Sequence, residues 1–84
     1  MIGSCHIATI AAYPVKASLG GGFRGVYLPV GGERIASPEL FKTLEQARFW
    51  AKNEAWNRHS TEPGYSVAAL NRRGEYQANI WVNA

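Results

Sequence analysis

The stretch from Thr43 to His59 constrains the fold most, because it is the only part of this 84-residue chain whose sequence favours a helix. Thr43 is a good N-cap, and Gln46 three residues later completes a capping-box pattern. At about 100° per residue, one narrow stripe of this helix is apolar and mostly small, and we assign it to the core. The stripe consists of Leu44, Ala47, Ala51 and Ala55. Its alanines predict that the helix lies close to a sheet.

The same helix carries more aromatic surface than one buried face requires. Phe49 and Trp56 are seven residues apart and share a second stripe, about 120° around from the alanines. Trp50 lies on the opposite flank, where we expect it to be mostly buried, as large aromatic side chains usually are. An exposed pair of Phe49 and Trp56 would form a patch of the kind that marks a protein partner or a homodimer interface.

The segments before the helix favour strands. Residues 5–13 are β-prone, and Pro14 is expected to end this strand or to place it at a sheet edge. Residues 23–30 predict a second strand, with Gly25 as a candidate bulge. Gly31 and Gly32 give a two-residue hairpin signal, after which residues 33–36 are expected to return as a short third strand.

The segments after the helix predict a hairpin. Residues 62–64 form a turn, and residues 65–71 pair with residues 75–83. Alternation in the second of these strands predicts an apolar face, which consists of Tyr76, Ala78, Ile80 and Val82. Gly74 favours a three-residue loop with a bulge, although a two-residue loop also leaves a plausible apolar face.

Together these patterns predict one α+β domain spanning residues 1–84, in which an antiparallel sheet of four to five strands packs against one α-helix in the order ββ(β)αββ. A domain of this size buries only a little over about 60% of the surface that its unfolded chain exposes. The chain is therefore too short for two domains.

Trp81 is the large exception on the polar face of the last strand. Either a loop or the N-terminal strand covers it, or it is an anchor for a partner. Tyr65 is expected to lie opposite or diagonal to Trp81, depending on the hairpin register.

The charge distribution suggests a second kind of partner. Six arginines against three lysines give a net charge of +3, and Arg72 and Arg73 are adjacent at the predicted hairpin tip. Arginine suits phosphate groups and stacked bases better than lysine does. Nucleic acid is therefore an alternative partner, bound by Arg72, Arg73 and Arg24, and a solvated turn is the simpler explanation of the tip.

The residue types argue against catalysis, a metal or a cofactor. Aspartate is absent, which removes aspartyl dyads and Asp-based calcium loops. Cys5 and His59 lack the Asn or Asp that would support a nucleophile and its base, and with His6 they give at most three soft ligands, short of the four of a structural zinc site. Gly20, Gly22 and Gly25 match G-x-G-x-x-G only as a string, between two strands rather than between a strand and a helix. We expect no enzyme, no cofactor and no small-molecule substrate.

Location follows from the cysteine count and the apolar runs. A single cysteine excludes an intramolecular disulfide and suits a reducing compartment, although a thiol near a strand start is usually a buried small residue. The longest apolar run, residues 7–13, is far short of a membrane span. We expect a cytoplasmic protein without membrane association.

Tyr27, Leu28 and Pro29, followed by the Phe-Lys-Thr-Leu-Glu-Gln-Ala run of residues 41–47, resemble the sheet-then-helix rhythm of HicB-like antitoxin domains. The resemblance covers about residues 23–55 and implies a noncatalytic partner-binding domain. The glycine usual in that family before the Thr-x-x-Glu-Ala-type segment is replaced here by residues 39–41, and no DNA-binding extension follows. We therefore do not assign the chain to that family.

The functional hypothesis is a noncatalytic protein-interaction module or a small accessory or inhibitor-type binding protein, whose partner is another protein or a second copy in a homodimer. Its predicted anchors are Phe49, Trp56, Trp81 and Tyr65.

Overall fold

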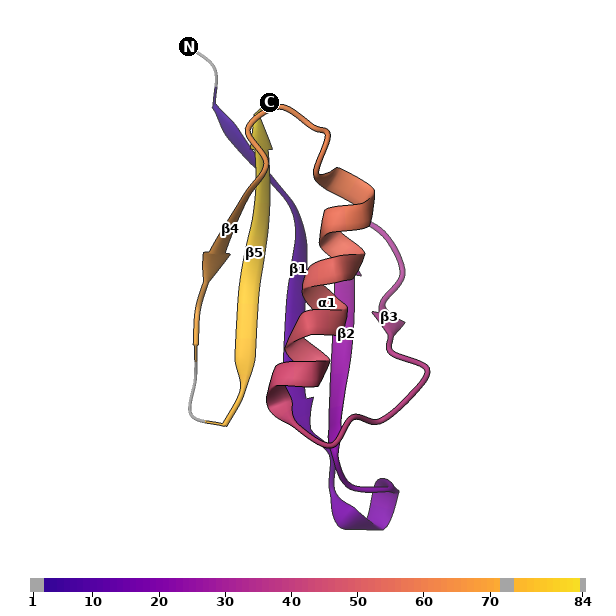
Figure 1. Ribbon diagram of the computed structural model, residues 1–84. Coiled ribbons are helices and arrows are strands. Elements are labelled where there is room, and N and C mark those ends of the chain that lie inside the picture. Colours follow the sequence, from indigo (N-terminus) through magenta and orange to yellow (C-terminus); the bar gives the residue numbers. More distant parts are fainter. Residues whose placement is uncertain (1–2, 72–73, 84) are drawn as a thin grey trace.

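One helix packs against a five-stranded antiparallel sheet in the computed structural model, which describes residues 3–71 and 74–83. The strand order across the sheet is β3-β2-β1-β5-β4, as Figure 1 shows. The elements in chain order are β1 (Ser4–Pro14), the 3-10 turn η1 (Ala17–Leu19), β2 (Phe23–Pro29), β3 (Ile35–Ala36), α1 (Leu44–His59), β4 (Ser66–Ala69) and β5 (Tyr76–Asn83). The predicted fold class and element order are confirmed.

The helix begins as its sequence predicts. The Thr43 hydroxyl accepts a hydrogen bond from the backbone N–H of Gln46 at 3.2 Å, and the Gln46 side chain accepts one from the Thr43 N–H at 3.3 Å. Ala47, Ala51 and Ala55 have no exposed surface, so the small stripe is the buried face of α1. The helix lies over β1 and β2, the strands with which it makes most of its contacts (Figure 1). The described part of the chain holds no other α-helix, and α1 lacks the length and apolarity to cross a bilayer.

Gly25 is the point of closest approach between helix and sheet. A Cβ added there would lie 2.6 Å from the carbonyl oxygen of Ala47 and 2.8 Å from the Trp50 ring. The predicted bulge at Gly25 is wrong, since its pairing with Ala12 falls within an unbroken register between β1 and β2. The missing side chain of Gly25 lets the helix pack closely on the sheet. The only register shift of β1 occurs in its pairing with β5, between His6 and Ala8.

The register separates the sheet into two faces. Ala8 pairs with Ile80 and Ile10 pairs with Ala78, and all four side chains are completely buried on the face toward α1. Their neighbours along the strands, such as Thr9, point to the opposite face because successive side chains alternate. No helix covers that opposite face in the described residues.

The turn between β2 and β3 lies earlier than the sequence suggested. The backbone N–H of Gly32 donates to the carbonyl of Pro29 at 3.2 Å, so Val30 and Gly31 are the central residues. Gly31 has a φ of 75°, which explains why glycine occupies the third position of the turn. The third strand is also shorter than predicted, because only Ile35 and Ala36 pair with β2.

Candidate functional site

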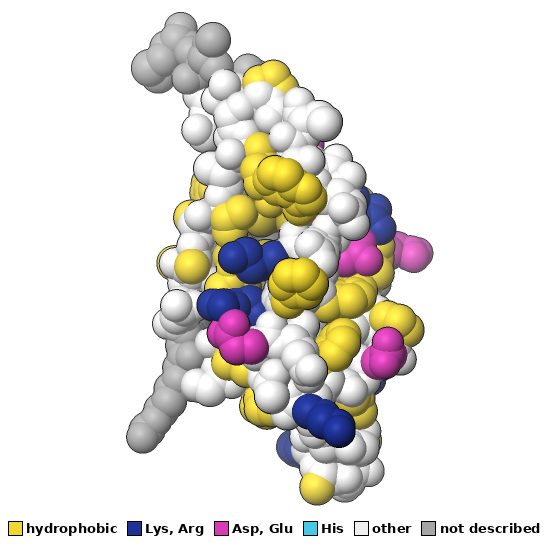
Figure 2. All heavy atoms as spheres, in the orientation of Figure 1, with side chains coloured by type: hydrophobic (Ala, Val, Ile, Leu, Met, Phe, Trp, Pro, Cys, Tyr) yellow, Lys and Arg dark blue, Asp and Glu magenta, His cyan; other side chains and the backbone are white. Residues whose placement is uncertain are grey.

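Two aromatic side chains of α1 project away from the core. Phe49 is 66% exposed and Trp56 is 57% exposed, whereas Trp50 is partly buried against the core. Exposure on this scale is unusual for large aromatic side chains and costs free energy unless another molecule covers them. Figure 2 shows hydrophobic side chains gathered on this side of the molecule, with Lys and Arg side chains among them.

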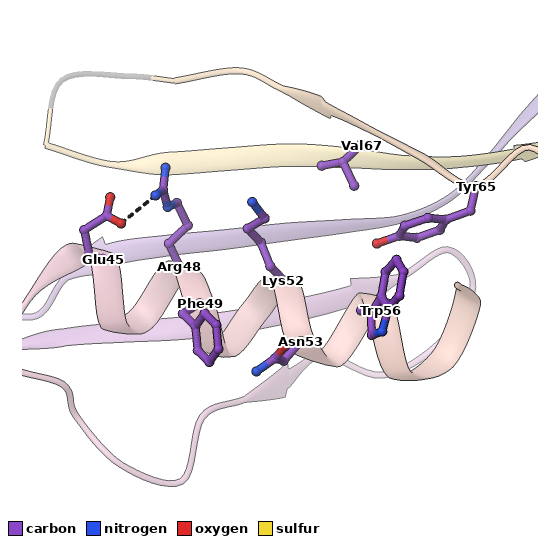
Figure 3. A pocket seen from close by; sticks show the side chains of 8 residues that line it. All are labelled: Glu45, Arg48, Phe49, Lys52, Asn53, Trp56, Tyr65 and Val67. Atoms are coloured by element: carbon purple, nitrogen blue, oxygen red, sulfur yellow. Dashed lines mark hydrogen bonds and ion pairs between the residues drawn. The ribbon is translucent and has the colours of Figure 1, made fainter. Parts of the chain in front are cut away.

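Trp56 lies at one end of a hollow between α1 and β4, which we call the α1–β4 groove. Its volume is about 340 Å³. Figure 3 shows the side chains that line it, which are Glu45, Arg48, Phe49, Lys52, Asn53, Trp56, Tyr65 and Val67. The Trp56 and Tyr65 rings meet edge to face with centroids 5.8 Å apart, and burial raises the pKa of the Tyr65 hydroxyl. This end of the groove is therefore apolar and aromatic.

The other end of the groove carries charge. Arg48 donates to the Glu45 carboxylate at 2.5 Å, and its guanidinium lies over the Tyr76 ring, 5.5 Å from the centroid. Lys52 lies between this pair and Trp56 and forms no ion pair with any described residue (Figure 3). Because Arg48 is already balanced by Glu45, Lys52 supplies the net charge of the groove.

Phe49 also borders a second hollow on the other side of α1. That hollow has a volume of about 530 Å³ and is lined by Phe41, Glu45, Gln46, Phe49, Trp50 and Asn53. Phe49 is thus a ridge between two concave surfaces. The two hollows share Glu45, Phe49 and Asn53 in their linings, so they adjoin along the helix.

Trp81 does not belong to this surface. It lies on the face of the sheet that points away from α1, where its ring is tilted against His6 with centroids 5.2 Å apart. Ser66, and not Tyr65, pairs with Trp81. Since side chains alternate along a strand, Tyr65 faces the helix instead. The sequence interpretation that placed Tyr65 opposite or diagonal to Trp81 is wrong, and the structure brings Phe49, Trp56 and Tyr65 together without Trp81.

The arginines proposed for nucleic acid are placed only in part. Arg72 and Arg73 lie outside the described residues. Arg24 lies at the start of β2, where its Nη1 donates to the backbone carbonyl of Ser37 at 2.8 Å. This hydrogen bond holds the segment that follows β3 against the sheet, so the Arg24 side chain has a structural role.

The sequence reasoning missed a network that joins α1 to β2. His59 Nδ1 lies 2.6 Å from a Glu62 carboxylate oxygen, and its Nε2 lies 2.5 Å from the Tyr27 hydroxyl. Because a carboxylate only accepts, Nδ1 carries the proton, and the Nε2 of a neutral imidazole accepts from Tyr27. Burial raises the pKa of the Tyr27 hydroxyl, despite the opposing charge of Arg58. The sequence signal for this network was the spacing of His59, at the end of the predicted helix, and Glu62 three residues later.

The remaining candidate ligands do not converge. Cys5 is exposed, contrary to the expectation of a buried thiol. His6 Nε2 forms a hydrogen bond with the Thr9 hydroxyl at 3.0 Å, and His59 Nε2 forms one with the Tyr27 hydroxyl. Among the described residues, no three His, Cys, Asp or Glu side chains are grouped as metal ligands.

Comparisons of the chain with protein-family models, with curated proteins and with solved structures give no match. The interpretation of the groove therefore depends on its geometry and chemistry.

Proposed function

We propose that this protein is a noncatalytic protein-interaction module that binds its partner through the α1–β4 groove and the adjoining helix surface. The observation that carries the proposal is the joint exposure of Phe49 and Trp56 on one side of α1. Aromatic residues are enriched among the side chains that dominate binding energies in protein interfaces. Tyr65 and Val67 extend the apolar surface across the groove to β4.

Self-association belongs to the same proposal. The proposed partner is another protein or a second copy of the chain, and the proposed role is that of a small accessory or inhibitor-type binding protein. A cytoplasmic location is also part of the proposal, because the exposed free thiol of Cys5 suits a reducing compartment.

Trp56→Ala is expected to weaken partner binding at least about tenfold while leaving the fold intact, because Trp56 is an exposed anchor at the aromatic end of the groove. The measurement is quantitative affinity capture of cross-linked partners from the source cell by the full chain, together with the light-scattering mass of the free protein. Leu19→Ala is the matched control, since Leu19 is 70% exposed but lies in η1, away from the groove. Unchanged capture and unchanged mass in Trp56→Ala would show that this surface is not the interface.

A second candidate function is nucleic-acid binding by the sheet face opposite α1. The observation that favours it is compositional, because the five strands contain Arg24 and no acidic residue. Trp81 and His6 lie on this face and offer rings on which bases can stack.

For this second candidate, fluorescence anisotropy with labelled single-stranded nucleic acid at about 50 and about 200 mM salt is expected to show binding that falls steeply with salt. Trp81→Ala would weaken it, whereas Trp56→Ala, on the other face, would not. Absence of binding at the lower salt concentration would exclude this function.

A further inference from the structure

β4 is a free and unprotected sheet edge. Among the residues that the structure describes, it ends the strand order and pairs only with β5. All four of its residues are exposed, and residues 66–70 include no charge and no proline. Natural proteins usually block such an edge with lysine, proline or a bulge, because its unpaired backbone groups are a template for another strand. The opposite edge strand, β3, is only two residues long.

The hydrogen-bonding pattern shows which groups are available. Leu70 donates its backbone N–H to the carbonyl of Gln77 at 2.6 Å. In an antiparallel ladder, the backbone groups of alternate residues form hydrogen bonds to the same neighbouring strand. The backbone N–H and C=O groups of Ser66, Ala68 and Leu70 therefore point toward β5. The backbone N–H and C=O groups of Val67 and Ala69 therefore point outward from the sheet.

The α1–β4 groove lies beside this edge, on the face of the sheet that α1 covers. Val67 of β4 and Tyr65, which precedes β4, line it together with Lys52 and Trp56 of α1 (Figure 3). A strand added along β4 would place side chains next to Val67 on that same face, because neighbouring strands share their faces.

We propose that an extended segment of a partner protein, with an apolar side chain two residues from an acidic one, adds to the sheet along the free edge of β4. The apolar side chain lies against Trp56, Tyr65 and Val67, and the carboxylate pairs with Lys52. The charge of Lys52, which no described residue balances, selects an acidic segment over a basic one. This inference rests on the proposed function and specifies the chemistry of its partner.

The probe is the peptide Thr-Glu-Thr-Leu-Thr-Glu-Thr, whose symmetry suits either strand direction. Titrated at millimolar concentration into the full chain labelled with ¹⁵N, it is expected to shift the amide signals of Val67 and Ala69 saturably and to slow their hydrogen exchange. The same peptide with lysine in place of glutamate is expected to bind about threefold more weakly, as the loss of an exposed ion pair implies. Lys52→Glu is expected to reverse this preference.

The matched variants are Ala69→Pro and Ala69→Thr. Proline removes an outward N–H without removing a bond to β5, so it is expected to abolish peptide binding, whereas threonine retains it. A peptide N-methylated at alternate amides makes the same test without changing the protein, should Ala69→Pro disturb the fold.

Three results of the peptide and light-scattering experiments would each overturn the proposal, and a partner-capture result would be a fourth. The first is the absence of a saturable shift in the amide signals of Val67 and Ala69. The second is peptide binding that survives both Ala69→Pro and N-methylation of the peptide. The third is a doubled light-scattering mass that Ala69→Pro abolishes, which would place a second copy of the chain on the edge of β4. Partner capture that depends on Trp56 but not on Ala69→Pro would refute strand addition and leave the proposed function standing.

Discussion

Gly25→Ala is expected to lower the free energy of unfolding by about 3 kcal/mol, at the upper end of the range for overpacked sites. The new Cβ would approach the Ala47 carbonyl oxygen to 2.6 Å, and this oxygen belongs to the helix backbone. A flexible side chain could move aside, but here α1 would have to lift from the sheet and lose contact along its alanine stripe. Denaturant unfolding followed by far-UV circular dichroism measures the change.

Gly3→Ala is the control for that measurement, because a Cβ at Gly3 would meet no atom within 4 Å. Its stability is expected to stay within about 0.5 kcal/mol of the original. If Gly25→Ala changes stability no more than Gly3→Ala does, close helix packing at this glycine contributes nothing to the fold.

Ile10→Ala is expected to lower the free energy of unfolding by about 3 kcal/mol and to lower Tm by about 12–24 °C. Ile10 is among the largest fully buried side chains, and it lies on the central strand between Ala78 of β5 and Tyr27 of β2. The many alanines around it offer little bulk to collapse into the cavity. A domain of this size has a total stability of only about 4–13 kcal/mol, so the loss is a large fraction of it.

Val30→Ala is the control for the core, since it also shortens an aliphatic side chain but at a position that is 63% exposed. Thermal unfolding by calorimetry is expected to show a shift of only a few degrees. A similar small shift for Ile10→Ala would mean that the site repacks without a cavity.

The helix and its buried face were predictable because their causes are local. A capping box depends on residues three positions apart, and the alanine stripe follows from the helical period alone. The same holds for β5, where strict alternation of four buried apolar side chains defined the core face. The turn after β2 was misplaced by one residue, because both Gly31 and Gly32 suit a turn and only the hydrogen bond from Gly32 to Pro29 distinguishes them.

The candidate site was predictable only in part. Phe49 and Trp56 could be paired from their spacing, but their exposure depends on how far α1 extends over β5 and β4. The separation of Trp81 from Tyr65 depends on a register that a one-residue slip would reverse. No local signal in the sequence shows that β4 ends the sheet.

The sequence by itself determined the class of fold and the inward face of its helix, because both follow from short-range periodicity and capping. Tertiary structure decided the roles of Gly25, Tyr65, Trp81 and the β4 edge. Each of these roles depends on strand order and register, which are fixed by contacts between residues far apart in the chain. The α1–β4 groove arises in the same way, since α1 packs over β1 and β2 and leaves the space beside β4 open.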